Sequence, residues 1–281
     1  MKHIKIITIG LVMTIGLFLQ GCINEFLDYK PQDKLTSAVF PENEDDIKML
    51  LNGVYALLRE TSISDQGLFG FGILDGATPN AFNWGINIDI AQAGNGTLTT
   101  SATKTLLFRW TRCYTIISRA NYFMKVIEFV DLNESVKAVY LGEAHFLRGL
   151  AYSILVESYG GVPIIDLNMS AEESRTVSRA STEEVWLQAI NDYNIAINNL
   201  TKDAPETGRA TKGAALGLKM RAYLYQNKYE EVLEVIEQID ALNKYALFPS
   251  YEGLFSPKNE NNKEVLFDIQ YIRGENLQGS W

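Results

Sequence analysis

The sequence has 281 residues, of which 47% are hydrophobic and 21% charged, and its formal net charge is −9 at pH 7. This composition is typical of a globular protein and excludes a disordered or fibrous one. A chain of this length can bury a sizeable core, in one large domain or two small ones. Its acidic surface would repel phosphate backbones, so nucleic acid is not expected as a partner.

The first 21 residues are typical of an export signal. Lys2 and Lys5 flank the start of an apolar run over residues 6–19, which is short of the roughly 20 apolar residues that cross a membrane. The run ends in Leu19-Gln20-Gly21-Cys22, the spacing that lipoprotein signal peptidase recognises. We predict cleavage before Cys22 and its lipidation, because two or more acyl chains anchor a protein stably. The alternative is an ordinary secretory signal with an incidental cysteine.

Removal of the signal peptide changes the net charge and limits the residues that could bind a metal or act in catalysis. Loss of two lysines lowers the formal charge from −9 to −11. If Cys22 carries lipid, Cys113 has no disulfide partner, and we interpret Cys113 as a small core residue on an apolar helical face. His145 is the one histidine of the mature chain. These residues offer little for a zinc site or a histidine-dependent nucleophile, so we expect no metal, no cofactor and no catalytic residue.

Apolar residues that recur every three or four positions predict six helices. Residues 22–42 contain two prolines in a polar stretch and are interpreted as a tether, followed by a body over 43–281. Asn43 is a candidate N-cap, and Ser181 with Glu184 forms a candidate capping box. The predicted helices cover about 44–59, 105–130, 134–159, 181–200, 211–226 and 229–242.

The fold class predicted is mainly α, with short strands near the C-terminal end. Residues 222–225 and 228–233 are typical of a tetratricopeptide repeat. The alternative is an ordinary helical hairpin, since only one convincing unit is visible. Residues 264–272 alternate and are rich in β-formers, so we predict a strand there. A lone strand needs a partner, and the little sequence that follows suggests truncation.

The connection over residues 61–104 is rich in glycine and aromatic residues and has no persistent helical period. A connection this long is usually functional or disordered, and its aromatic residues argue against disorder. Sugars are recognised by aromatic faces together with amides and carboxylates. The alternative for Trp84 is that it packs the loop onto the body. The predicted ligand-binding residues are Asp75, Phe82, Asn83 and Trp84, with Asn80 nearby.

Four sequence blocks together resemble the N-terminal half of the SusD/RagB family of outer-membrane nutrient-binding lipoproteins. They are Phe26-Leu27-Asp28 with Pro31; residues 143–152, closing on Tyr159-Gly160-Gly161-Val162-Pro163; residues 208–215; and residues 254–257 through 262–267. Their order and spacing are similar to those of the family along the whole mature chain. The family's ligand face also draws on the loop between its first two long helices, the place that residues 61–104 occupy.

The resemblance implies a helical body with tetratricopeptide-like helix pairs, held by lipid at the outer membrane and facing the cell exterior. Proteins of this family act in polysaccharide utilisation: they cap a TonB-dependent transporter, bind glycans or in some members peptides, and pass them on without catalysis. Members are usually much longer, so the sequence corresponds to a truncated form without the family's C-terminal half.

Two other functions compete with nutrient binding. A tetratricopeptide-type scaffold would bind only protein. A glycan hydrolase would need paired carboxylates such as Glu172 with Glu173 or Glu183 with Glu184, but adjacent residues on a helix point in different directions. Glu143 and Arg148 lie on a strongly apolar helix, and we interpret them as members of structural ion pairs with neighbours and not as catalytic groups.

Overall fold

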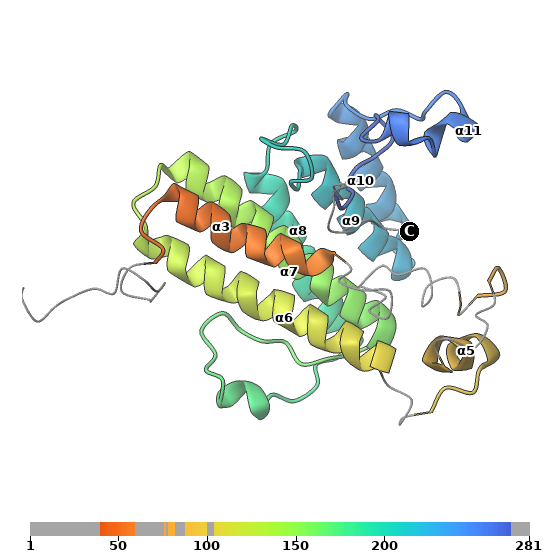
Figure 1. Ribbon diagram of the computed structural model, residues 1–281, viewed down its shortest axis with the longest axis horizontal. Coiled ribbons are helices and arrows are strands. Elements are labelled where there is room, and N and C mark those ends of the chain that lie inside the picture. Colours follow the sequence, from red (N-terminus) through yellow and green to blue (C-terminus); the bar gives the residue numbers. More distant parts are fainter. Residues whose placement is uncertain (1–39, 60–75, 77, 82–87, 100–103, 271–281) are drawn as a thin grey trace, which may run out of the picture. The chain divides into compact units, whose positions relative to one another are not determined.

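The computed structural model is mainly helical (Figure 1), which confirms the predicted fold class. The chain divides into two units, Met1–Glu42 and Asn43–Trp281, and every helix described belongs to the second. The structure describes residues 40–59, 76, 78–81, 88–99 and 104–270. Its α-helices are α3 (Glu44–Tyr55), α5 (Ile88–Asn95), α6 (Lys104–Val126), α7 (Glu134–Tyr159), α8 (Thr182–Asn199), α9 (Lys212–Tyr225), α10 (Tyr229–Ala241) and α11 (Tyr251–Leu254). Its 3₁₀ helices are η1 (Ala56–Leu58), η2 (Ile127–Phe129), η3 (Glu173–Arg175) and η4 (Pro257–Asn259).

Side-chain caps start two of these helices as the sequence predicts. Asn43 accepts a hydrogen bond from the backbone N–H of Asp46 at 3.0 Å. At α8, the Ser181 hydroxyl accepts from the Glu184 N–H at 3.2 Å, and the Glu184 carboxylate accepts from the Ser181 N–H at 2.7 Å. This reciprocal arrangement satisfies two backbone donors that the first helical turn leaves without a partner.

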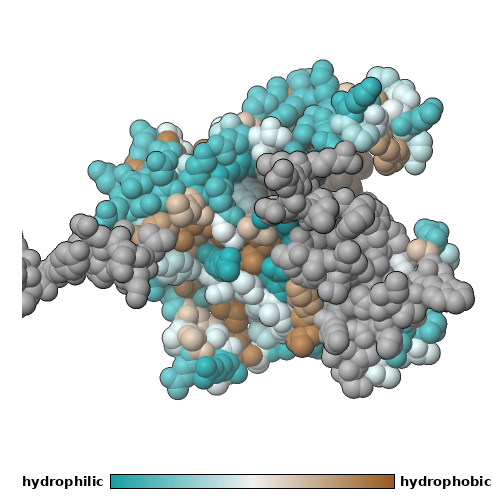
Figure 2. All heavy atoms as spheres, in the orientation of Figure 1, coloured by the Kyte–Doolittle hydropathy of each residue, from teal (hydrophilic) through white to brown (hydrophobic). Residues whose placement is uncertain are grey.

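The α7 helix is the centre of the bundle. It packs against α6 on one side and α8 on another, and α3 lies against both α6 and α7 (Figure 1). After α8, the α9 helix packs on α8 and pairs with α10 to form the predicted hairpin. In the space-filling view of Figure 2, hydrophilic residues dominate around α10 and α11, whereas hydrophobic residues are interspersed among polar ones along α3 and α6.

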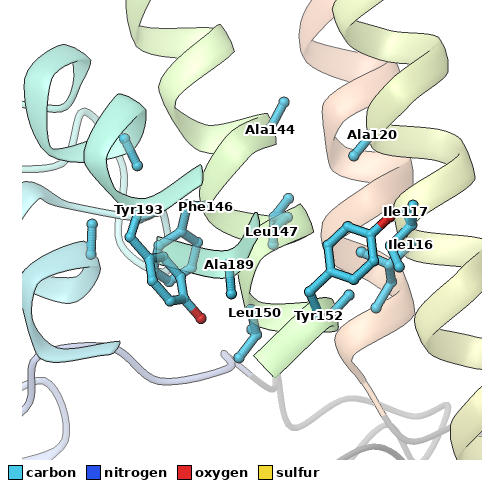
Figure 3. Close-up of a cluster of buried hydrophobic side chains, with 14 of the residues drawn as sticks. Ile116, Ile117, Ala120, Ala144, Phe146, Leu147, Leu150, Tyr152, Ala189 and Tyr193 are labelled. Atoms are coloured by element: carbon cyan, nitrogen blue, oxygen red, sulfur yellow. The ribbon is translucent and has the colours of Figure 1, made fainter. Parts of the chain in front are cut away.

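The core between α6, α7 and α8 includes two fully buried tyrosines, shown in Figure 3. The Tyr152 hydroxyl accepts a hydrogen bond from the Ile165 N–H at 2.9 Å, and the Tyr193 hydroxyl lies 2.8 Å from the Ser153 hydroxyl. Both phenols are therefore satisfied in an apolar environment, which avoids the cost of an unpaired buried hydroxyl. Around them pack Ile116, Ile117, Ala120, Ala144, Phe146, Leu147, Leu150 and Ala189.

A glycine sets the distance between α7 and α8. A Cβ added at Gly149 would lie 2.9 Å from Tyr193 Cε1 and 3.1 Å from Asp192 Cβ. Contacts this short force neighbouring atoms to move, so the close approach of the two helices requires glycine at this position.

Cys113 lies on α6 and is fully buried, which confirms its interpretation as a core residue. Burial raises the pKa of its thiol to about 12, because desolvation disfavours the thiolate.

Two expectations about the elements were wrong. Residues 264–270 form no strand, and none of the described residues does. The apolar side chains of this segment pack instead on the helical body: Phe267 meets Phe146 edge to face, with ring centroids 5.0 Å apart. In addition, α5 forms within the connection for which no helical period was found. Eight residues give barely two turns, too few for an apolar repeat to stand out.

Candidate ligand-binding site

The four predicted ligand-binding residues, Asp75, Phe82, Asn83 and Trp84, lie outside the described residues. Their role remains a prediction. The structure describes Gly76, residues 78–81 and residues 88–99 of the same connection, and Asn80 is exposed there. The segment that contains Asn83 and Trp84 therefore runs between an exposed turn and α5.

Two glycines bring both sides of this segment together. A Cβ added at Gly94, on α5, would lie well inside van der Waals contact with the backbone carbonyl oxygen of Gly76. A backbone atom cannot swing away as a flexible side chain can, so this approach excludes every other residue type at Gly94 without a backbone shift. The contact makes Gly76 and Gly94 neighbours in space.

The described part of α5 also holds polar groups that could meet a ligand. Gln92 has a buried side-chain oxygen that accepts no hydrogen bond from the described residues. Asn95 accepts from the Thr97 N–H at 3.0 Å and from its hydroxyl. Amides of this kind can accept from and donate to sugar hydroxyls, so the residue types on α5 fit the predicted ligand chemistry.

Arg148 and Glu143 belong to two buried ion-pair networks. Arg148 donates to Asp192 and to Asn121, and Asp192 also accepts from His145 at 2.7 Å and from Gln188 at 3.1 Å. Burial opposes ionisation of Asp192, but the hydrogen bonds from His145 and Arg148 outweigh it and hold the pKa of Asp192 below its ordinary value.

The second network joins α3, α7 and the segment before α9. One oxygen of Glu143 accepts from the Tyr55 hydroxyl at 2.6 Å and from Arg209 Nη1 at 3.2 Å. Arg209 also donates to Asn52 at 2.7 Å. Burial raises the pKa of Glu143 and exceeds the opposing effect of Arg209. Both networks confirm that Glu143 and Arg148 belong to structural ion pairs.

The carboxylate pairs considered for hydrolysis are caps. Glu173 accepts from the Ser170 N–H at 2.8 Å, as Glu184 does from the Ser181 N–H. These backbone hydrogen bonds lower the pKa of both carboxyls, the opposite of what a general acid requires. Across the residues that the structure describes, no three histidine, cysteine or acidic side chains gather where they could hold a metal ion.

Two partners in these networks escaped the sequence analysis. Asp192 lies seven residues after Val185 and three after Ala189, on the same apolar stripe of α8. A carboxylate at a buried helical position indicates a charged partner, so this signal was available. Arg209 lies in the polar loop between α8 and α9, and no periodic sequence pattern indicates that it is buried.

Among the described residues, no helix is long and apolar enough to cross a bilayer. The predicted signal peptide and nearly all of the tether lie outside the described residues.

Comparisons with known proteins agree with the resemblance. The chain is 25% identical over 273 residues to the SusD-like protein P25 of Formosa agariphila, covering 91% of this chain and 51% of the relative. A crystal structure of a SusD-like protein from Bacteroides fragilis superposes with a TM-score of 0.75 at 27% identity, covering 87% of this chain and 48% of that one. The chain thus spans about half the length of its relatives.

A second similar structure has a fold in common with this chain at lower identity. Surface glycan-binding protein A from Bacteroides thetaiotaomicron, in complex with laminarihexaose, gives a TM-score of 0.71 at 19% identity, over 82% of this chain and 50% of that one. A protein-family model for SusD-like proteins matches residues 25–224. Its description is starch-binding, associating with the outer membrane. The chain therefore belongs to the SusD-like family.

Proposed function

We propose that the chain is a non-catalytic, cell-surface lipoprotein that captures glycans and delivers them to a TonB-dependent transporter in the outer membrane. The observation that carries this proposal is the family match over residues 25–224, which includes both buried ion-pair networks up to Arg209. Peptides are the other ligand class that the family resemblance implies.

The glycan part of the proposal places the ligand at the connection over residues 61–104, which contains the Gly76–Gly94 contact. Trp84 would stack on the apolar face of a sugar, while Asp75 and Asn83 would bind its hydroxyls. The similar fold of the protein solved with laminarihexaose supports a glycan as ligand. In the central bundle, the large aromatic residues Phe123, Phe146, Tyr152 and Tyr193 are buried in the core and cannot stack on a sugar.

The surface location depends on Cys22. Acyl chains on this residue would hold the protein at the outer membrane, and the tether over residues 22–42 would separate the helical body from the lipid. The transporter partner is implied by the family resemblance, and co-purification after chemical crosslinking in cells would test it.

Calorimetric titration with a panel of neutral glucans, laminarihexaose included, would test glycan binding. We expect Trp84→Ala to weaken binding by up to about tenfold, because stacking of one ring contributes roughly 0.5–1.5 kcal/mol. Phe129→Ala is a matched control, since Phe129 is an exposed ring on η2. Equal affinity of Trp84→Ala and the unchanged protein would assign Trp84 to packing.

One observation favours the alternative of a protein-binding scaffold. The α9–α10 hairpin exposes several large apolar side chains, which could meet a protein partner. Absence of glycan binding, together with retention of a protein partner that is lost when these side chains are replaced by serine, would support the scaffold. The side chains are Leu224, Tyr225, Tyr229, Leu233 and Ile236.

A further inference from the structure

The sequence contains two Asn-Gly dipeptides, Asn52-Gly53 and Asn95-Gly96. An asparagine that precedes glycine can react with its own chain, because the next backbone nitrogen can attack the side-chain amide and glycine has no Cβ to hinder the approach. The reaction requires the two groups to meet, so the fold decides which dipeptide reacts. One dipeptide lies inside α3, and the other lies at the C-terminal end of α5.

Asn52-Gly53 is held in place by contacts within α3 and from outside it. The Asn52 carbonyl accepts a hydrogen bond from the Ala56 N–H. Asn52 Oδ1 accepts from Arg209 Nη2 at 2.7 Å, and the Gly53 carbonyl accepts from Arg119 Nη1 at 2.9 Å. Attack by the Gly53 nitrogen on the Asn52 side chain would therefore require α3 to open and lose these contacts.

Asn95-Gly96 has few such restraints. Asn95, Gly96 and Thr97 are exposed. Gly96 has a φ of +72°, and a Cβ built there would meet nothing within 4 Å. The Gly96 N–H donates to the Ala93 carbonyl at 3.4 Å, longer than the roughly 2.7–3.2 Å of an ordinary N–H···O bond. The nitrogen that must attack is thus weakly engaged and open to solvent.

Thr97 supplies hydrogen-bond donors to the side-chain carbonyl of Asn95. Asn95 Oδ1 accepts from the Thr97 N–H at 3.0 Å and from the Thr97 hydroxyl. The Thr97 N–H also donates to the Gln92 carbonyl at 2.9 Å, whereas the hydroxyl bonds to Asn95 alone among the described residues. Negative charge develops on Oδ1 when a nucleophile adds to the amide carbon, and donors already in place stabilise that charge.

We propose that Asn95 is a site of spontaneous deamidation. Hydroxide removes the proton of the Gly96 nitrogen, which then forms a bond to Asn95 Cγ. The Cγ–Nδ2 bond breaks, and the leaving nitrogen takes up a proton from water and departs as ammonia, so that a succinimide ring remains. Water then opens the ring at either carbonyl. The net reaction consumes one water, releases one ammonia and leaves aspartate or isoaspartate. This proposal does not rest on the proposed function.

The modification would change the end of α5 in two ways. Either product adds a negative charge at the C-terminal end of the helix, where the helix dipole already disfavours negative charge. Isoaspartate also adds a methylene group to the main chain directly after Gly94, the residue that contacts Gly76. We therefore expect the last turn of α5 to loosen in protein that has been stored.

Incubation of the purified protein in mildly alkaline buffer, followed by tryptic digestion and mass spectrometry, would test the proposal. Cleavage after Lys48, Arg59 and Lys104 separates the two dipeptides. Conversion in the folded protein should be at least about tenfold faster at Asn95 than at Asn52. In guanidinium chloride the two rates should become similar, because the contacts of α3 are lost. Labelling by an isoaspartate methyltransferase should identify the isomerised product.

Three variants at exposed positions sharpen the test, with circular dichroism to establish that each is folded. Asn95→Gln should abolish the fast conversion, because its longer side chain must close a larger ring, whereas the matched Asn52→Gln should leave it unchanged. Thr97→Val keeps the shape but removes the hydroxyl, and it should slow conversion at Asn95 at least about twofold.

Conversion at Asn52 as fast as at Asn95 in the folded protein would overturn the proposal. A preference for Asn95 that persists unchanged in guanidinium chloride would also overturn it, since the fold would then have no part in the selection. An unchanged rate in Thr97→Val would overturn the role of the Thr97 hydroxyl.

Discussion

Arg148 and Asp192 join α7 to α8 through a two-point ion pair, with Arg148 Nε 2.9 Å from Asp192 Oδ2 and Arg148 Nη2 2.7 Å from Asp192 Oδ1. Asp192 is fully buried, and Gly149 allows its backbone to approach α7 closely. The pair thus lies beside a close contact between the two helices, and each charge depends on the other for compensation.

Replacing Asp192 by asparagine should destabilise the protein strongly. The substitution keeps the size of the side chain but leaves the Arg148 guanidinium buried without a counter-charge, which typically costs about 3–5 kcal/mol. Urea unfolding would measure the loss. Glu128→Gln is the control, because the Lys137–Glu128 pair is exposed and such pairs contribute under about 1 kcal/mol. Similar losses in the two variants would contradict the importance of burial.

Asp192 should also contribute to the pH dependence of the free energy of unfolding in acid. The pKa of Asp192 is lower in the folded protein than its ordinary value, so its stabilising contribution is complete above about 3.9, the ordinary value of aspartate. The contribution is lost as the pH falls from there through the folded pKa. The free energy of unfolding should therefore decline less steeply below pH 4 in Asp192→Asn than in the unchanged protein. Parallel curves would refute this.

Gly94→Ala should disturb the loop and leave the helical body intact. The added methyl group meets the Gly76 carbonyl, so the backbone at Gly76 and Gly94 must separate. We expect weaker glucan binding with little change in the unfolding of the bundle. Gly53→Ala is the matched control, because its Cβ would have open space within α3. Equal glucan affinity in both variants would show that the Gly76–Gly94 contact does not position the ligand site.

Cys22→Ala should abolish attachment of lipid. The prediction follows from the apolar run that ends in Leu19-Gln20-Gly21-Cys22. Metabolic labelling with a fatty acid would give a labelled band for the unchanged protein and none for the variant, which should accumulate unprocessed or be released. Cys113→Ala, at the other cysteine, should retain the label. Labelling that persists in Cys22→Ala would contradict the assignment.

Helices that depend on local signals could be predicted closely. The predicted limits 134–159 coincide with α7, because Asn133 caps its first turn and Gly160 follows its last residue. The capping box of α8 was likewise visible in four consecutive residues. Such signals act over a few positions and survive in any tertiary context that buries the apolar stripe.

Features that depend on distant partners could not be predicted. The alternation over 264–270 correctly marks apolar side chains that are partly buried, yet it does not say what they pack against. Phe267 meets a ring on α7, so no second strand is needed. Similarly, the partner of Arg148 is 44 residues away. The pattern of one segment contains no information about such pairings.

The candidate ligand-binding residues remain a prediction that rests on residue types and not on geometry. The aromatic and amide residues of the connection over 61–104 pointed to sugar chemistry. The contact between Gly76 and Gly94 joins residues 18 positions apart through backbone atoms, and glycine-rich composition alone does not say which pair meets.

The burial of Cys113 makes the chain convenient for single-site labelling. Cys22 and Cys113 are its two cysteines, and the Cys113 thiol is both enclosed and held protonated, so maleimides and other thiol reagents will react with it slowly. A fluorophore attached through Asn80→Cys, in a variant that starts after Cys22, would therefore report from the rim of the proposed glycan site without prior removal of the native thiol. The same protection shields the sulfur from oxidants.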